Sequence, residues 1–299
     1  MRVVVFGASG TIGRPLVAEL AREHDVVAVS RRDHPDAGGV TWRVADATDG
    51  DSVARVLDGA DVAYYLVHSL GNPDFEAQDI RAAETTARET ERAGVRQLVY
   101  LGGLGDDSAD LSPHLRSRRE TGLRLASTSV PVTMFRAAMV VGRGSAAFET
   151  ILALVDRLPA MVTPRWVSSR TQPIALADVV GYLAGACGLE PAFGRAYDVG
   201  GPEVMTYREM IERIARLRGR NPFIFEVPVL TPHLSSLWLH LVTPVNAGVA
   251  RPLIEGLRND TVVHDDRIRE LLPFELTPFD AAARAALAEG AGDAVTIAP

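Results

Sequence analysis

The sequence contains no lysine, so all 31 of its basic side chains are arginines. This absence excludes every mechanism that needs a lysine amine. Cysteine is nearly absent as well, and the single Cys187 excludes an intramolecular disulfide. Because Cys187 lies in an apolar stretch, we interpret it as a buried structural thiol rather than a nucleophile.

Two further absences narrow the class of protein. The net charge of −7 and the lack of a basic cluster argue against a partner made of nucleic acid. No uncharged apolar run reaches the roughly 20 residues of a membrane span, and the N-terminus reads as a strand rather than a signal peptide. We therefore expect a cytoplasmic protein. A chain of 299 residues can bury a core without a metal, and no metal site is predicted.

The first two thirds of the chain alternate short β-branched runs with amphipathic stretches, which predicts β-α-β units. After Gly142 this alternating pattern of the sequence ends, and prolines recur between apolar segments that are predicted to be helical. Pro159 to Gln172 is predicted as a loop. We therefore predict an α/β fold with a Rossmann-type, doubly wound parallel sheet and a smaller, mostly helical substrate-binding region. The predicted core is residues 1–142, with 170–199 returning to it, and the smaller region is residues 143–169 and 200–299.

A glycine-rich loop joins the first predicted strand to the helix after it. Its residues are Gly7, Ala8, Ser9, Gly10, Thr11, Ile12 and Gly13. Gly7 permits the tight turn, Gly10 lets the backbone approach a pyrophosphate, and Gly13 lets helix and strand pack closely. The N–H groups at the helix N-terminus then face the phosphates. The alternative, a plain strand-to-helix turn, is disfavoured by this context, so the loop predicts a nicotinamide dinucleotide site.

The end of the second predicted strand bears on the choice of dinucleotide. Ser30 is followed by Arg31 and Arg32. An acidic residue here binds the ribose hydroxyls of NAD, whereas a guanidinium fork suits a 2′-phosphate. We therefore predict NADP(H) in preference to NAD(H). The alternative is a solvated basic loop, and Asp33 could still meet a ribose hydroxyl.

Strand ends supply the other predicted cofactor contacts, because ligands bind outside the carboxyl ends of parallel strands. Asp46 follows the third strand and either accepts a hydrogen bond from the adenine amino group or forms a turn, and both roles are compatible. The further candidates at strand ends are Ala47, Leu66, Val67, Gly102, Gly103 and Ala137.

Three more segments complete a recognisable pattern: Arg136 to Gly142, Gln172 to Val179, and Gly200 to Tyr207. Together with the glycine loop and Asp46, they resemble the short-chain dehydrogenase/reductase superfamily. The chain is most similar to its atypical, NmrA-like NAD(P)H-binding group, which is related to YbjT. The resemblance extends over nearly the whole chain, from about Val3 to Ala288.

That resemblance implies a Tyr-x-x-x-Lys pair with an upstream serine, and this chain departs from it. The lysine cannot exist here, and Leu101 to Gly105 stands where the serine is expected. His114 and Arg118 occupy the register of the tyrosine and lysine, one helical turn apart. In one interpretation His114 is the proton donor, tuned by Arg118, which also contacts the cofactor or substrate. In the other, both are ordinary first-turn helix residues.

A second histidine competes for the role of proton donor. His68 and Ser69 follow the strand predicted from Val62 to Val67, so they should project toward the nicotinamide, its ribose or the substrate. A lone histidine is usually structural, but this placement makes His68 both a catalytic and a cofactor-binding candidate.

Four hydrophobic residues are predicted on the substrate side. Met139 and Phe148 flank the segment that lines the pocket in relatives, and Trp166 lies in a loop with arginines. That loop either clamps an aromatic or acidic substrate or bridges domains through salt bridges. Trp238 lies in an apolar helical stretch that either roofs a hydrophobic pocket or is buried in a homodimer interface.

These features predict an NADPH-dependent reductase of a small hydrophobic or aromatic carbonyl, quinone or enone, with a non-standard proton donor. Two alternatives stay open at this point. One is a non-catalytic NADP(H)-binding sensor or assembly protein, which the missing Tyr/Lys pair favours. The other is an NAD(P)-dependent epimerase or dehydratase built from the same parts.

Overall fold

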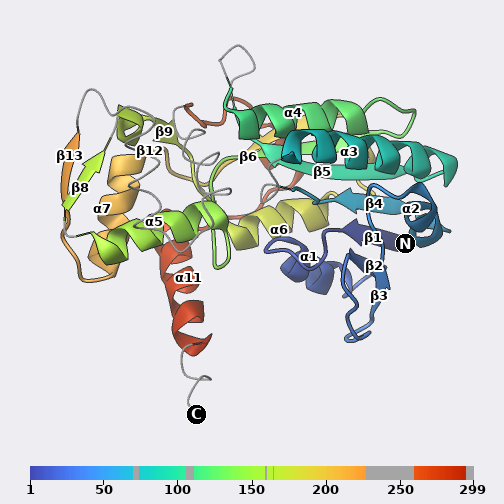
Figure 1. The fold of residues 1–299 in the computed structure, drawn as a ribbon, viewed down its shortest axis with the longest axis horizontal. Helices are drawn as coiled ribbons and strands as arrows, with labels where there is room; N and C mark the ends of the chain where they lie inside the picture. Colours follow the sequence, from blue (N-terminus) through green and yellow to red (C-terminus); the bar gives the residue numbers. More distant parts are fainter. Residues whose placement is uncertain (70–73, 106–110, 159, 164, 227–258, 294–299) are drawn as a thin grey trace.

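The computed structural model describes residues 1–69, 74–105, 111–158, 160–163, 165–226 and 259–293. A seven-stranded parallel sheet forms its centre, in the order β11-β6-β5-β4-β1-β2-β3 (Figure 1). The predicted α/β Rossmann fold is therefore confirmed. In chain order the strands are β1 (Arg2–Phe6), β2 (Asp25–Ser30), β3 (Val40–Val44), β4 (Val62–Tyr65), β5 (Gln97–Gly103), β6 (Val132–Ala137) and β11 (Ala196–Val199).

Two layers of helices cover the sheet, which is why its central strands are apolar on both faces. Successive residues of β1 belong to opposite cores: Val3 and Val5 pack on one side, and Val4 and Phe6 on the other. The helices α1 (Gly13–Leu20) and α6 (Leu176–Gly185) lie on the first side, and α2 (Gly50–Leu57), α3 (Phe75–Arg92) and α4 (Pro113–Leu125) on the second (Figure 1).

The strand order reverses beside β1. The chain runs outward from β1 through β2 to β3, then returns to place β4 on the other side of β1. Such a reversal opens a crevice at the carboxyl ends of the flanking strands, where ligands bind in open α/β sheets. The glycine loop after β1 and the segment after β4 therefore meet at one edge of the sheet.

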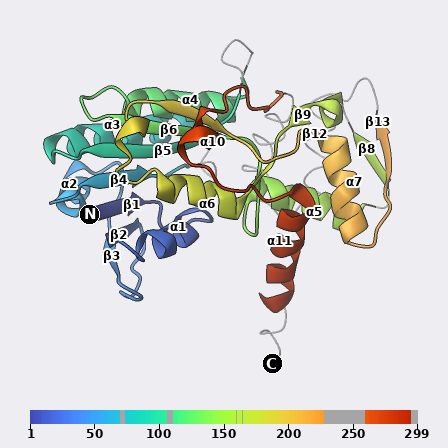
Figure 2. The same ribbon diagram turned by 180° about the vertical axis from the view of Figure 1, so that it is seen from behind.

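The remaining elements form a second hydrophobic core beside the sheet, at the end occupied by α5 and α7 (Figures 1 and 2). Three small strand pairs accompany its helices in the described residues. The prediction of a loop from Pro159 to Gln172 was wrong. That segment carries β8, a short helix η1 and β9, because distant strands pair with it. The elements are β7 (Val140–Val141), α5 (Ala146–Arg157), β8 (Ala160–Thr163), η1 (Arg165–Ser168), β9 (Arg170–Thr171), β10 (Ile174–Ala175), β12 (Met205–Thr206), α7 (Tyr207–Leu217), β13 (Phe223–Glu226) and α11 (Phe279–Asp293).

Two shorter helices complete the described chain, η2 (Glu190–Ala192) and α10 (Arg267–Leu271). Figure 2 shows α10 on the side of the molecule opposite that of Figure 1. In the described part of the chain, no helix combines the length and the hydropathy that a membrane crossing requires.

Candidate functional site

The glycine loop is so tightly folded that a side chain would not fit at Gly7 or Gly13. Gly7 has φ +82°, in the left-handed region that disfavours other residues. A Cβ atom at Gly13 would lie 2.3 Å from the carbonyl oxygen of Gly7, and one at Gly10 would lie 3.2 Å from the same atom. The loop therefore presents bare backbone at the start of α1, which is the cradle that a pyrophosphate requires.

Beside this loop lies a hollow of about 260 Å³, which we call the adenosine-side hollow. Arg31 lines it, whereas Arg32 does not and uses its backbone N–H to bond the Ser30 hydroxyl. The predicted residues around it are Gly7, Ser9, Gly10, Arg31, Asp46, Ala47, Leu66, Val67, His68 and Ser69. The structure adds residues that sequence reasoning missed: Phe6, Val29, Ser30, Ala45, Thr48, Gln78 and Ala82.

Asp46 both forms a turn and lines the adenosine-side hollow. Its Oδ1 accepts hydrogen bonds from the backbone N–H of Thr48 at 2.8 Å and from the Thr48 hydroxyl at 2.7 Å. These bonds, together with the positive charge of Arg31, lower the pKa of the Asp46 carboxyl. Asp46 is thus an anion at neutral pH, beside Arg31 on the wall of the same hollow.

On the other side of the glycine loop lies a larger hollow of about 500 Å³, the nicotinamide-side hollow. It brings together His68, which follows β4, and the pair His114 and Arg118 of α4, which lies far from His68 in the sequence. Other predicted residues that line it are Gly7, Gly10, Thr11, Ile12, Gly13, Leu66, Gly102, Gly103, Ala137 and Met139. Tyr207 and Thr261 also line it, and no local signal in the sequence pointed to them.

One predicted substrate contact lies elsewhere. Phe148 is fully buried in the core of the smaller region and lines neither hollow. It faces inward because α5 packs against α7, and its apolar face must be covered. Trp166 lies in η1, and Trp238 lies outside the described residues.

Arg118 is a buried cation held by backbone oxygens. Its guanidinium donates to the carbonyl oxygen of Leu101, at the end of β5, and to that of Val67 at 3.4 Å. It also lies 5.1 Å from the centre of the Tyr100 ring, a cation–π contact. The Tyr100 hydroxyl in turn donates to the Arg118 carbonyl at 2.7 Å. The guanidinium therefore fixes α4 against the ends of two strands and brings a positive charge to the hollow.

That charge acts on both histidines. Desolvation by the surrounding protein and the positive charge of Arg118 lower the pKa of His68 to about 4, although the residue is exposed at the mouth of the hollow. Burial, Arg118 and the neighbouring His68 lower the pKa of His114 to about 3. Both imidazoles are therefore neutral at pH 7, and each has one N–H donor and one acceptor nitrogen.

Lowering the pH from 7 to 5 is expected to reduce the free energy of unfolding, with His114 contributing about 1 kcal/mol of the loss. An unfolded histidine binds a proton below about pH 6.5, whereas the folded His114 resists it down to about pH 3. The lowered pKa therefore has little effect on stability above about pH 6.5, and it destabilises the folded state progressively as the pH falls from about 6.5 toward 3. Urea denaturation at both pH values should show a smaller loss for His114→Gln, and equal losses would contradict the assignment.

A hydrogen bond ties the glycine loop to the smaller region across the nicotinamide-side hollow. The Thr11 hydroxyl donates to the carbonyl oxygen of Gly144 at 2.9 Å. Gly144 has φ +78° and precedes α5, whose first residues also line the hollow. The hollow therefore has one wall from the Rossmann core and another from the smaller region.

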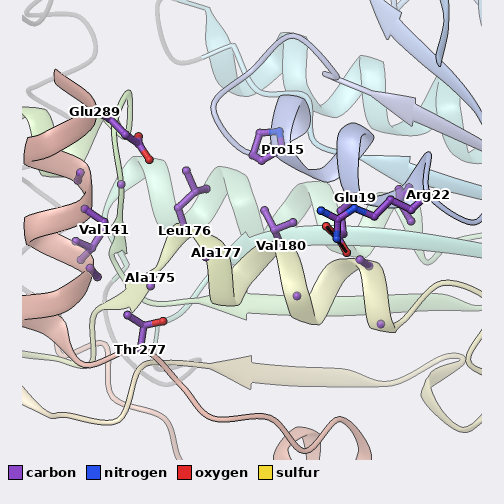
Figure 3. Close-up of a pocket in the computed structure, with 18 of the residues that line it drawn as sticks. Pro15, Glu19, Arg22, Val141, Ala175, Leu176, Ala177, Val180, Thr277 and Glu289 are labelled. Atoms are coloured by element: carbon purple, nitrogen blue, oxygen red, sulfur yellow. Dashed lines mark hydrogen bonds and ion pairs between the residues drawn. The ribbon is translucent and has the colours of Figure 1, made fainter. Parts of the chain in front are cut away.

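A third hollow, of about 720 Å³, lies apart from these two (Figure 3). Pro15 and Glu19 of α1, and Arg22 just after it, face Leu176 and Val180 of α6 across it, and α11 closes one end (Figure 3). None of the predicted site residues that the structure describes is among those that line it. The described residues also contain no group of three or more histidine, cysteine or acidic side chains placed to hold a metal ion.

Comparison with known proteins agrees with this geometry. Residues 7–128 match a family described as NAD(P)H-binding. The chain is 31% identical over 235 residues to (4-alkanoyl-5-oxo-2,5-dihydrofuran-3-yl)methyl phosphate reductase of Streptomyces griseus, which covers 75% of this chain and 76% of that protein. It is 24% identical over 301 residues to mitochondrial NADH dehydrogenase [ubiquinone] 1 alpha subcomplex subunit 9 of Arabidopsis thaliana, covering 92% of this chain and 75% of that protein.

Among solved structures, the fold resembles triphenylmethane reductase of Citrobacter sp. in complex with NADP(H). The TM-score is 0.75 at 17% identity, over 96% of this chain and all of that one. The resemblance seen in the sequence is thereby confirmed, since the family match, the curated relatives and the fold agree. The chain belongs to the NAD(P)H-binding, NmrA-like group of atypical short-chain dehydrogenases/reductases.

Proposed function

We propose that this protein is an NADPH-dependent reductase of a small hydrophobic carbonyl, quinone or enone. The class of oxidoreductase that uses NAD(P)H follows from the family and from relatives named as reductases. One observation supports the more specific proposal of a hydrophobic carbonyl, quinone or enone substrate. A hollow with largely apolar walls holds a glycine-rich cradle, two neutral histidines and a buried cation.

The residues of the two hollows fit a dinucleotide that spans the glycine loop. In this proposal the backbone of Gly10 to Gly13 holds the pyrophosphate, and Asp46 and Ala47 border the adenine. Arg31 would hold the 2′-phosphate, since a guanidinium matches the oxygens of that group. Gly102, Gly103 and Ala137 would floor the nicotinamide end, where a reduced nicotinamide supplies a hydride equivalent.

The neutral state of the histidines determines what they can do. With a pKa near 4, only about one His68 ring in a thousand is protonated at pH 7, and His114 is protonated still less. Neither is a good reservoir of protons. A neutral imidazole N–H still donates a hydrogen bond and polarises a substrate carbonyl oxygen as negative charge develops there. The proton that completes reduction would then come through this contact from water.

Arg118 supports the same chemistry without giving up a proton. Its positive charge keeps the imidazoles neutral and stabilises the negative charge that develops on a substrate oxygen. The walls beside it, from Leu104, Leu115 and Met139, favour an apolar substrate body. This combination supports a hydrophobic carbonyl compound or a conjugated analogue.

Substitution of each histidine tests the proposal. With purified protein, NADPH and a panel of quinones and enones, His68→Ala and His114→Ala are each expected to lower turnover by about 10-fold or more. Absorbance of the reduced nicotinamide reports the rate. The exposed His264 offers a matched control, and His264→Ala should keep full turnover. Tight NADPH binding by the unaltered protein with no turnover of any substrate would rule out the reductase proposal.

In this proposal the preference for NADPH depends on Arg31, which lines the adenosine-side hollow. Arg31→Ala is expected to weaken NADPH binding by about 10-fold to 100-fold, since charge-assisted hydrogen bonds contribute about 1.5 to 3 kcal/mol. Fluorescence titration should show less than about threefold change for NADH. The adjacent Arg32→Ala is the control, because Arg32 does not line the hollow. Equal weakening of both dinucleotides would refute the assignment to the 2′-phosphate.

A second candidate function is a non-catalytic, NADP(H)-binding assembly or sensor protein. Its support is the similarity over 92% of this chain to a protein named as a subunit of NADH dehydrogenase. The absence of lysine, and with it the Tyr-x-x-x-Lys pair, also favours it. The turnover panel above separates the two functions. An epimerase or dehydratase remains a third use of the same parts, and retention of bound NADP(H) with no net oxidation would be its signature.

A further inference from the structure

A buried carboxyl group that the proposed chemistry does not use interacts with Arg118, one of the residues that line the nicotinamide-side hollow. It belongs to Asp79 of α3, which is only 2% exposed. Tyr65 of β4 and Arg118 of α4 both interact electrostatically with its carboxyl group. Among the described residues, neither Asp79 Oδ1 nor the Tyr65 hydroxyl has a hydrogen-bond partner. A buried carboxylate is costly, so its position calls for a physical reason.

The hydrogen bonds of Asp79 connect the two segments that carry the histidines. The hydroxyl of Ser117 donates to Asp79 Oδ2 at 3.3 Å. Ser117 is buried in α4, between His114 and Arg118. Ser69, the residue after His68, interacts with the same carboxyl group, and its hydroxyl and backbone N–H favour the charged form of Asp79. The Asp79 carboxyl group of α3 thus interacts with Ser69, next to His68, and with Ser117, three residues after His114.

These contacts offset only part of the cost of burying the carboxyl group. Burial raises the pKa of Asp79 above its ordinary value, and Ser69, the charge of Arg118 and the bond from Ser117 reduce that increase without cancelling it. The carboxyl group therefore gains its partners from the two segments whose spacing matters for the hollow. A leucine of similar size would fill the same space but would contact neither serine through a hydrogen bond. The carboxyl group therefore serves to position the two segments rather than to increase the free energy of unfolding.

We infer that Asp79 is a positioning residue, which holds the segment of His68 and helix α4 at the spacing that brings both imidazoles to one hollow. Its importance for turnover rests on the proposed function, whereas the connection itself is a property of the folded chain. Displacements of about 1 Å in such a site reduce rates by up to about 100-fold, so a small loosening should be measurable.

Histidine side-chain NMR on the full-length protein tests this without any substrate. His68→Gln and His114→Gln assign the two imidazole signals. Asp79→Ala is expected to shift or broaden both signals, while that of the exposed His264 stays in place. Asp79→Asn should keep both near their original positions, because its amide oxygen still accepts the serine bonds. If Asp79→Ala does not fold, Ser117→Ala removes one bond alone and should move the His114 signal.

Asp178→Ala is the matched control. Asp178 of α6 is 5% exposed and accepts hydrogen bonds from the backbone N–H of Thr277 at 2.8 Å and from its hydroxyl at 2.9 Å. It therefore also joins two segments, but it lines neither cofactor-side hollow. Its removal should lower Tm and leave both histidine signals unmoved. The same outcome for Asp79→Ala and Ser117→Ala would overturn the inference and make Asp79 a structural residue only.

A kinetic measurement distinguishes a failure of this inference from a failure of the proposed function. Where the unaltered protein turns over a substrate, Asp79→Ala should lower kcat by about 10-fold while the Kd for NADPH changes less than about threefold. Asp79→Asn should recover most of that loss. Shifted histidine signals in a protein with no reductase activity would remove the proposed function and leave the positioning role standing.

Discussion

Gly13→Ala is expected to abolish NADPH binding, with a loss of affinity of at least about 100-fold. The added methyl group would lie 2.3 Å from the Gly7 oxygen and 2.7 Å from Ala8 Cα, both of which are backbone atoms. The loop must therefore move, and its N–H groups no longer converge on a pyrophosphate. The same overlap should cost about 1 to 3 kcal/mol of stability, as overpacking does.

Fluorescence titration with NADPH measures this effect, and Gly50→Ala is the control. Gly50 begins α2, and a methyl group there meets only the ends of the Glu89 and Arg88 side chains, at 3.4 and 3.5 Å. This variant should bind NADPH as the unaltered protein does. A Gly13→Ala protein with undiminished affinity would show that the dinucleotide does not bind at this loop.

Arg118→Met is expected to lower the free energy of unfolding by about 2 to 4 kcal/mol and to abolish turnover. The methionine fills a similar volume but cannot donate to the carbonyl oxygens of Leu101 and Val67. It also removes the cation beside the Tyr100 ring. Each carbonyl left without a partner in the interior costs about 1 to 3 kcal/mol. Urea denaturation gives the stability, and the NADPH-linked assay gives the turnover.

Arg124→Met, in the same helix, is the appropriate comparison. Arg124 is exposed and pairs with Glu120 and Glu84 at 2.7 and 3.2 Å, as surface ion pairs do. Such pairs contribute about 0 to 1 kcal/mol, so this variant should lose little stability and no turnover. Similar losses in the two variants would mean that Arg118 acts as an ordinary helix residue.

The cofactor loop could be predicted from sequence because its chemistry is local. Gly7, Gly10 and Gly13 occur within one strand-to-helix turn, and each answers a steric requirement of that turn. Arg31 was predicted on the same grounds, from its place at the end of β2. Arg32 has the same side chain one residue later, and the backbone geometry alone keeps it off the hollow.

The other half of the site depended on contacts between distant segments. His114 and Arg118 could be placed in one helix by register, yet their approach to His68 required α4 to pack beside α3 across β4 and β5. Phe148 is a second residue whose position could not be predicted from local sequence. Its apolar character fitted a substrate pocket as well as a core, and only the packing of α5 against α7 decided for the core.

By itself, the sequence determined the α/β fold, the dinucleotide loop and the loss of any lysine-based catalysis, because glycine spacing, periodicity and residue type act over a few neighbouring residues. The tertiary structure alone decided that Arg118 is a buried cation, that His68 and His114 share one hollow, and that Asp79 contacts both of their segments. Burial and electrostatic interaction depend on distances in space, and these are set only when the helices pack on the sheet.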